Sequence, residues 1–170
     1  MIPRAVLAAV LFLGLAACAG AAGPAPRSAA ARPARTVAFQ TVDQRGIPGQ
    51  SGGEIRQVAR DDASWRALWA QLREGGGDVL PEEPPTVDFD HEMAIVVAMP
   101  TQSCVSKVTI QSVVRQGSGA VVNLLEAPPA PNCTCIVSQR PIHVVRVPRV
   151  EGTVRFVARR GQTPCGPNRF

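Results

Sequence analysis

Cysteine and histidine side chains gather in the last third of the chain, where metal binding, redox chemistry or structural crosslinking could occur. Cys133 and Cys135 are one residue apart and precede a β-like run that contains His143. With Cys104 they form a set of sulfur and nitrogen donors that suits Zn²⁺ or Cu⁺. No CxxC pair strengthens that reading, and the alternation of the strand places His143 on a partly apolar face. The chemistry of the thiols therefore depends on the compartment of the protein.

The N-terminus predicts export. It carries one positive charge at Arg4, an apolar stretch from Ala5 to Leu13, and then Leu-Ala-Ala-Cys. This layout is typical of a secretory signal and is too short to span a membrane. The Leu-Ala-Ala-Cys ending resembles the bacterial lipoprotein box, in which a peptidase cleaves before the cysteine. We expect Cys18 to be the lipidated first residue of the mature protein, and Ala19 after it favours the outer membrane, facing the periplasm.

Four cysteines remain after lipidation of Cys18, and an even number in an oxidising compartment predicts disulfides. A bridge between Cys133 and Cys135 is disfavoured, because extended residues two apart lie about 6.5 to 7 Å between Cα atoms. We favour Cys104–Cys135 with Cys133–Cys165, since Cys135 enters a strand as Cys104 does and the C-terminal tail could reach Cys133. Cys104–Cys133 with Cys135–Cys165 is the alternative. No cofactor is expected.

A second cluster, at residues 87–93, holds Asp88, Asp90, His91 and Glu92. Carboxylates beside a histidine could bind a divalent cation or exchange protons. The second histidine of a zinc-protease helix is missing, however, and the segment runs directly into an apolar strand. We interpret it as a solvated turn. The sequence holds no nucleophile elbow, P-loop or dinucleotide fingerprint, so we expect no catalytic residue, no metal site and no enzymatic activity.

The charge balance indicates the kind of partner. A net charge of +5 and an isoelectric point near 9.5 would suit nucleic acid or an anionic membrane. Arg4, Arg27, Arg32 and Arg35 lie near the N-terminus, outside the expected folded core, and only Lys107 of the 18 basic residues is lysine. Aromatic residues for base stacking are scarce and tyrosine is absent. We exclude nucleic acid and expect contact with the membrane through the lipid anchor.

One amphipathic helix is predicted near residues 62–73. Apolar side chains recur there at helical spacing on a single stripe: Trp65, Leu68, Trp69 and Leu72. Asp61 or Asp62 can cap its start, Arg73 suits its last turn, and Gly75 to Gly77 end it. Two tryptophans could form a ligand platform, but at this spacing they favour the core face of the helix.

Most of the remaining chain predicts β-strands, separated by short turns that carry glycine or proline. The expected strands are residues 36–43, 53–59, 94–99, 105–115, 120–127, 135–138, 142–148 and 153–159. In the long run 105–115, Val108, Ile110 and Val114 share one parity and are expected to face the core.

The fold class follows from one helix among many strands. Val154, Phe156 and Ala158 alternate with Arg155 and Arg159 in the last run, as in a half-buried strand. A single helix does not make a repeating βαβ pattern. We therefore expect an α+β fold with about 7 to 8 mainly antiparallel strands, in a sandwich or a curved sheet, and one packed helix.

The domain organisation predicted from composition has three parts. Residues 1–17 are expected to be the signal peptide, and residues 18–35 the lipidated cysteine with a disordered tether rich in Ala, Gly, Pro and Arg. Residues 36–170 are of the size of one domain.

Several segments resemble, in order and spacing, the C-terminal domain of the PrcB family of protease-complex components. These are the Trp65-x-x-x-Trp69 helix, Val87-Asp88-Phe89, the apolar strand 94–99, Pro100-Thr101, the long strand 105–115, and the closing Pro141-x-x-x-Val145-x-Val147-Pro148. The resemblance covers roughly residues 54–158. The chain departs from the family at Gln102, Ser103 and Cys104, where such domains tend to have Gly-Gly-Tyr.

The resemblance implies a lipoprotein accessory domain without catalysis, which associates with or stabilises an envelope protease complex. The expected partner is an envelope protein, with a protease as the implied candidate. The rival function is an envelope metal-binding or thiol-redox protein that uses Cys104, Cys133, Cys135 and His143.

Overall fold

The computed structural model describes residues 34–49, 51–74 and 79–165. The predicted signal peptide, Cys18, most of the tether and Gly75 to Gly77 lie outside these residues. Nine strands and one helix occur in the described part of the chain: β1 (Arg35–Val37), β2 (Gln40–Pro48), β3 (Ile55–Ala59), α1 (Asp62–Arg73), β4 (Glu92–Ala98), β5 (Gln102–Ser103), β6 (Lys107–Gln116), β7 (Gly119–Ala127), β8 (Ser138–Pro148) and β9 (Val154–Arg160).

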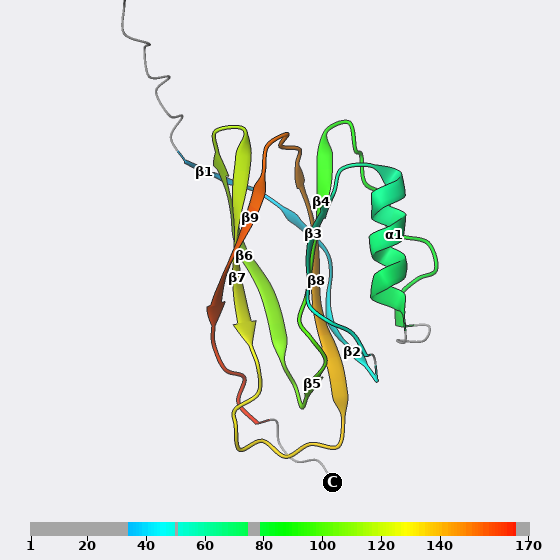
Figure 1. The fold of residues 1–170 in the computed structure, drawn as a ribbon, viewed down its shortest axis with the longest axis vertical. Coiled ribbons are helices and arrows are strands. Elements are labelled where there is room, and N and C mark those ends of the chain that lie inside the picture. Colours follow the sequence, from blue (N-terminus) through cyan, green and yellow to red (C-terminus); the bar gives the residue numbers. More distant parts are fainter. Residues whose placement is uncertain (1–33, 50, 75–78, 166–170) are drawn as a thin grey trace, which may run out of the picture. The chain divides into compact units, whose positions relative to one another are not determined.

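The strands form two sheets that pack face to face. The first sheet has the order β1-β6-β7-β9 and the second has the order β2-β8-β4-β3, with β5 also paired to β8. The pairs are antiparallel except for β7 with β9, which run parallel. Helix α1 covers the outer face of the second sheet (Figure 1). The prediction of an α+β fold, mainly antiparallel and with one packed helix, is confirmed.

The apolar run of β4 is continuous because both faces of the second sheet are covered. Ala94 and Val96 face the helix, while Met93, Ile95 and Val97 face the first sheet. Alternate residues of one strand thus enter two different cores. The absence of polar alternation in this strand is the signature of a sheet buried on both sides.

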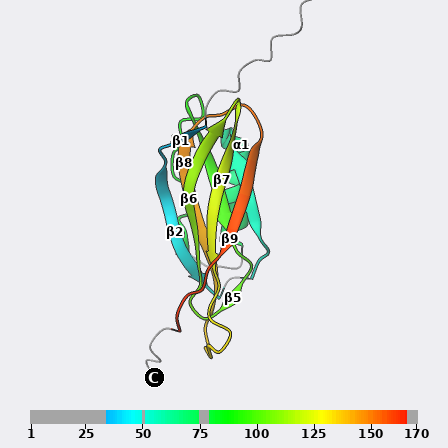
Figure 2. The same cartoon turned by 90° about the vertical axis from the view of Figure 1, so that its left-hand side faces the viewer.

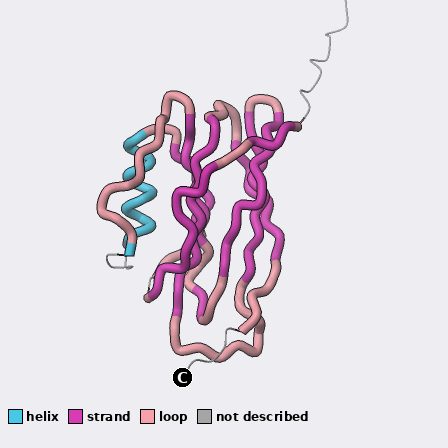
Figure 3. The backbone as a smooth tube through the Cα atoms, turned by 180° about the vertical axis from the view of Figure 1, so that it is seen from behind, coloured by secondary structure: helices cyan, strands magenta, loops and turns pink. Residues whose placement is uncertain are grey.

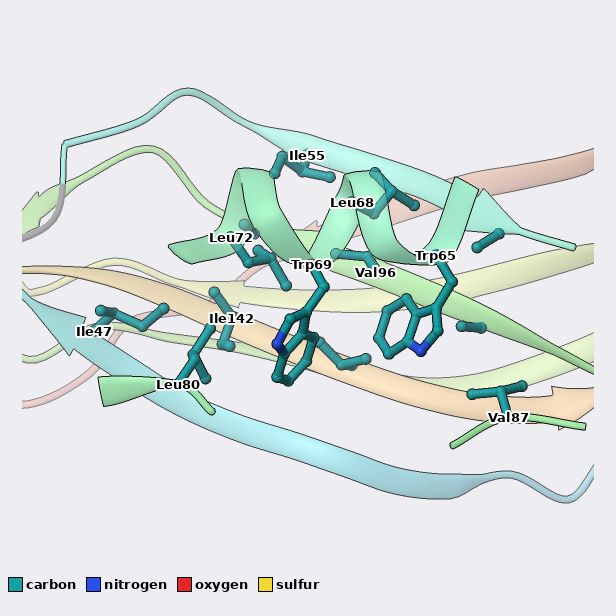
Figure 4. Close-up of a cluster of buried hydrophobic side chains, with 14 residues drawn as sticks. Ile47, Ile55, Trp65, Leu68, Trp69, Leu72, Leu80, Val87, Val96 and Ile142 are labelled. Atoms are coloured by element: carbon teal, nitrogen blue, oxygen red, sulfur yellow. The ribbon is translucent and has the colours of Figure 1, made fainter. Parts of the chain in front are cut away.

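Helix α1 begins and docks as its sequence predicts. The Asp61 side chain accepts a hydrogen bond from the Ser64 amide at 2.7 Å, which satisfies one of the free donors at the helix start. The buried residues of the helix are Trp65, Leu68, Trp69 and Leu72. Figure 4 shows both indole rings between the helix and the second sheet, near Val87 and Leu80. The core-face interpretation of the tryptophans is therefore confirmed.

The predicted strand 36–43 is in fact two strands in different sheets. β1 pairs with β6 in the first sheet, and β2 pairs with β8 in the second. The chain crosses between the sheets at Ala38 and Phe39, and Phe39 packs against the core between them. An apolar alternation that continues through a crossover looks like one long strand in the sequence.

A β-bulge overturns part of the predicted inward face of β6. The register shifts between Ile110 and Ser112, so that Gln111 is an extra residue and the parity changes after it. Val108 and Ile110 are buried as expected, but Val113 takes the next core position and Val114 is only half-buried. In β9, Val154 and Phe156 pack against the core as predicted, whereas Ala158 is exposed.

Candidate functional site: a crosslinked apolar tip

Two disulfides close one end of the sandwich. Cys104 is bonded to Cys135, with 5.1 Å between their Cα atoms, and Cys133 is bonded to Cys165, with 5.4 Å. The disulfide prediction is confirmed, with the favoured pairing. The loop 128–137 crosses from the first sheet to the second at this end, as the view from behind shows (Figure 3). Each bridge ties this loop to a different neighbouring segment.

Backbone hydrogen bonds support the same loop. The Cys104 amide donates to the Val137 carbonyl at 3.0 Å, and the Ala130 amide donates to the Thr163 carbonyl at 3.1 Å. β5 pairs with the first residues of β8, at Gln102–Gln139 and Ser103–Ser138. The loop is therefore fixed on both sides by main-chain contacts as well as by sulfur.

Large apolar side chains project from this rigid end into solvent. Ile136 is fully exposed, Val105 is 60% exposed and Val137 is 57% exposed. They lie close together for two reasons. Val105 and Ile136 directly follow the two cysteines of the Cys104–Cys135 disulfide, and the Val137 carbonyl accepts a hydrogen bond from the Cys104 amide. We call Val105, Ile136 and Val137 the crosslinked tip. Exposed apolar side chains that are gathered on a rigid support are typical of an interaction surface.

A groove adjoins the crosslinked tip between the two sheets. Its volume is about 300 Å³. Its lining residues come from β2, β6 and β8, from the two residues before β6 and from the segment after β9: Gln44, Arg45, Gly46, Val105, Ser106, Lys107, Val108, Gln139, Ile142 and Thr163. Val105 belongs to both the tip and the groove. The Ser106 hydroxyl is buried and has no hydrogen-bond partner among the described residues. The groove is large enough to receive a side chain of a partner bound at the tip.

Cys104 has an unusual backbone conformation. Its φ is 64°, in the left-handed region, where a residue with a Cβ costs roughly 1 to 2 kcal/mol. The bond to Cys135 and the hydrogen bond to Val137 hold it there. This conformation lets the chain leave β5 and turn toward β6, which places Val105 outward.

The acidic cluster is a solvent-exposed turn, as interpreted from the sequence. The Asp88 carbonyl accepts from the amides of His91 at 3.0 Å and Glu92 at 2.6 Å. The Asp88 carboxylate lies 2.9 Å from His91 Nδ1; this bond raises the pKa of His91 and lowers that of Asp88. Asp90 donates its amide to Asp88 at 3.2 Å. These bonds close the turn that starts β4.

His143 joins the two sheets and is 2% exposed. Its Nδ1 accepts from the Ile110 amide at 2.8 Å, and its Nε2 lies 3.1 Å from the Thr41 hydroxyl. Because an amide can only donate, Nδ1 must be unprotonated, and the proton lies on Nε2. The ring is therefore neutral and satisfies an amide on a part of β6 that β1 does not cover.

Burial and the positive charge of Lys107 lower the pKa of His143 to about 4. An unfolded chain binds this proton near pH 6.5. Between these two pH values the unfolded state takes up a proton that the folded state does not, so acidification favours unfolding. The free energy of unfolding lost in this way is on the order of 3 kcal/mol. We expect the free energy of unfolding to fall more steeply from pH 6.5 to 4.5 for the wild type than for His143→Gln. Urea titrations at a series of pH values measure this, and equal slopes would contradict the assignment.

The residues of the rival metal or redox function are otherwise engaged. Cys104, Cys133 and Cys135 are in disulfides, and both ring nitrogens of His143 have partners. Within residues 34–49, 51–74 and 79–165, no group of three or more His, Cys, Asp or Glu side chains is placed to hold a metal ion. We do not propose the metal-binding or thiol-redox function.

Comparisons with known proteins found no relative. No family model, curated protein or solved structure matches the chain. In the part of the chain that the structure describes, no helix has the length and apolar character needed to cross a membrane.

The sequence predicts the cysteines of the site but not its exposed apolar residues. The prediction of a strand at 135–138, which would include Ile136 and Val137, is wrong, since β8 begins only at Ser138. Two apolar residues between a crosslinked cysteine and a strand, after the proline-rich stretch 128–131, were the available signal. The sequence does not predict the short strand β5, and the predicted strand 105–115 wrongly includes Val105, which precedes β6 and is exposed.

Proposed function

We propose that the protein is a lipoprotein anchored to the cell envelope through Cys18, which acts without catalysis by binding another envelope protein at the crosslinked tip. The exposure of Val105, Ile136 and Val137 on a disulfide-bonded support carries the proposal. A support that is already ordered loses little conformational entropy when a partner binds. The resemblance to the C-terminal domain of the PrcB family favours a protease complex as the partner.

The position of the tip suits an anchored module. Arg35 of β1 pairs with Arg115, at one end of β6, whereas the crosslinked tip adjoins Lys107, at the other end. Ten residues of strand separate these ends by about 30 Å. Figure 1 shows β1 and the 128–137 loop at opposite ends of the sandwich. An anchor joined to the N-terminal side of β1 leaves the tip free for a partner.

Site-specific crosslinking in cells tests the proposal. A photoreactive amino acid at position 136 is expected to capture an envelope protease. In a second experiment the probe is at position 105, and the added substitution Ile136→Asp is expected to reduce capture at least roughly tenfold, as for loss of a buried apolar anchor. A probe at Gln116, which is exposed at the opposite end, is the matched control. Cells fed a fatty-acid analogue should label the wild type and not Cys18→Ser.

Two outcomes would contradict the proposal. One is the same set of captured proteins from positions 136 and 116. The other is capture that Ile136→Asp leaves unchanged. Because Ile136 makes no buried contact, Ile136→Asp should change the free energy of unfolding by less than about 0.5 kcal/mol, so loss of capture would not reflect unfolding.

A further inference from the structure

β9 forms an edge of the first sheet with hydrogen-bonding groups that have no strand partner. It is the last strand in the order β1-β6-β7-β9, and Figure 2 shows it at the margin of that sheet. The Ala120 amide donates to the Thr153 carbonyl, and the Gly161 amide donates to the Glu126 carbonyl. In a parallel pair only alternate residues bond to the neighbour. The amides of Phe156 and Ala158 therefore point away from β7.

The outer face of this edge has a defined charge pattern. Val154 and Phe156 pack against the core between the sheets, so the residues of opposite parity, Arg155, Val157 and Arg159, face solvent. Val157 is 44% exposed. The edge therefore presents one apolar side chain between two guanidinium groups.

The two arginines have no acidic partner among the described residues. Arg155 has one long contact, 3.4 Å to the Gln116 side-chain oxygen, and no hydrogen bond or ion pair of Arg159 is found in the described chain. Five arginines elsewhere, in contrast, form ion pairs with Asp or Glu: Arg45, Arg56, Arg66, Arg146 and Arg149. The positive charge on β9 is thus unneutralised where a strand could be added.

We propose that β9 binds an extended acidic segment of another protein, which adds as a strand at the free edge. Its acidic side chains at positions i and i+4 would lie beside Arg155 and Arg159, and an apolar side chain at i+2 would lie beside Val157. Cross-strand pairs of opposite charge stabilise a sheet, and like charges destabilise it. This acidic–apolar–acidic pattern is symmetric along the segment, so it fits a parallel or an antiparallel added strand.

Neither the terminal segments of this sequence nor a second copy fits the charge pattern of the edge. Residues 1–33 and 166–170 contain no Asp or Glu, so neither terminal segment carries the required charge. Pairing of β9 with β9 of a second copy would bring arginines against arginines, which is unfavourable. This binding edge differs from the crosslinked tip, and the inference does not depend on the proposed function.

A peptide titration tests the inference on the full chain with both disulfides formed. The probe is a capped nine-residue peptide with glutamate at its third and seventh positions, valine at its fifth and threonine elsewhere. Amide NMR spectra are expected to shift at Phe156 and Ala158, and hydrogen exchange at these two amides is expected to slow. Binding should weaken with added salt, and a peptide with lysine in place of glutamate should bind at least roughly tenfold more weakly.

Charge exchange and a backbone block separate recognition from misfolding. The double variant Arg155→Glu with Arg159→Glu should lose the glutamate peptide and gain the lysine peptide. Ala158→Pro removes an outward amide and should abolish binding, because proline is tolerated on edge strands but cannot donate; Ala158→Thr keeps the amide and should bind as the wild type does. Equal binding of the two peptides, or shifts confined to β2 or β3, would overturn the inference.

Discussion

Replacement of Trp69 by alanine is expected to lower the free energy of unfolding by about 3 to 5 kcal/mol. The Trp69 ring is buried between α1 and the second sheet, 5.2 Å from the ring centre of Trp65. Its indole N–H donates to the Pro81 carbonyl at 2.9 Å, while Trp65 donates to Pro85 at 2.8 Å. Truncation would therefore open a cavity and leave a proline carbonyl without its donor.

Urea denaturation followed by far-ultraviolet circular dichroism measures this effect. Gln71→Ala, on the exposed side of the same helix, is the matched control and should change stability by less than about 0.5 kcal/mol. Trp69→Phe keeps most of the packing and loses only the hydrogen bond, so it should fall between the two. A loss below about 1 kcal/mol for Trp69→Ala would show that the tryptophan pair contributes little to the helix–sheet core.

Loss of the Cys104–Cys135 bridge is expected to cost about 3 to 4 kcal/mol. The bonded residues are 31 apart in sequence, and closing a loop of that length in the unfolded chain gives a stabilisation of this size by the chain-entropy estimate. The double variant Cys104→Ser with Cys135→Ser also removes the support for the positive φ at Cys104. We therefore expect the crosslinked tip to lose its fixed conformation before the sheets unfold.

Guanidinium titration of the wild type and of the double variant measures the stability difference. The matched control is Cys133→Ser with Cys165→Ser, which opens a loop of similar length, 32 residues, but leaves Cys104 bonded. Hydrogen exchange of the Cys104 amide, which bonds to Val137, should accelerate in the first variant and not in the control. Equal exchange in both variants would contradict a specific role of the first bridge in ordering the tip.

The sequence predicts those elements whose determinants are local. The prediction of helix α1 is correct because two local features define it: Asp61 caps its start, and its apolar residues recur at helical spacing. The predictions of the central strands are correct because short apolar runs that are rich in β-branched residues and bounded by turn residues, such as the run of β4, are typical of buried strands. The prediction of a turn at Asp88 is correct because the hydrogen bonds of this turn join residues at most four apart in the sequence.

The errors concern properties that depend on distant parts of the chain. The bulge at Gln111 adjusts β6 to β7, so no feature near Val114 alone reveals that Val113 faces the core. Ala38 and Phe39 become a crossover only because β1 and β2 have partners in different sheets. The exposure of Ile136 likewise depends on the bridges that hold its loop off the sheet. Apolar composition alone favoured a strand there.

The central place of β8 in the second sheet has a consequence for the order of folding. β8 lies between β2 and β4, and its contacts include Gln40 with Arg146, more than one hundred residues apart. Such non-local contacts make folding slow, because a long loop must close before any pairing is gained. The second sheet cannot be completed until the final quarter of the polypeptide is available. Until then β4 lacks its neighbour β8, and the tryptophan face of α1 lacks Ile142 and Val144, so the apolar surface left uncovered is exposed to aggregation or to capture by a chaperone.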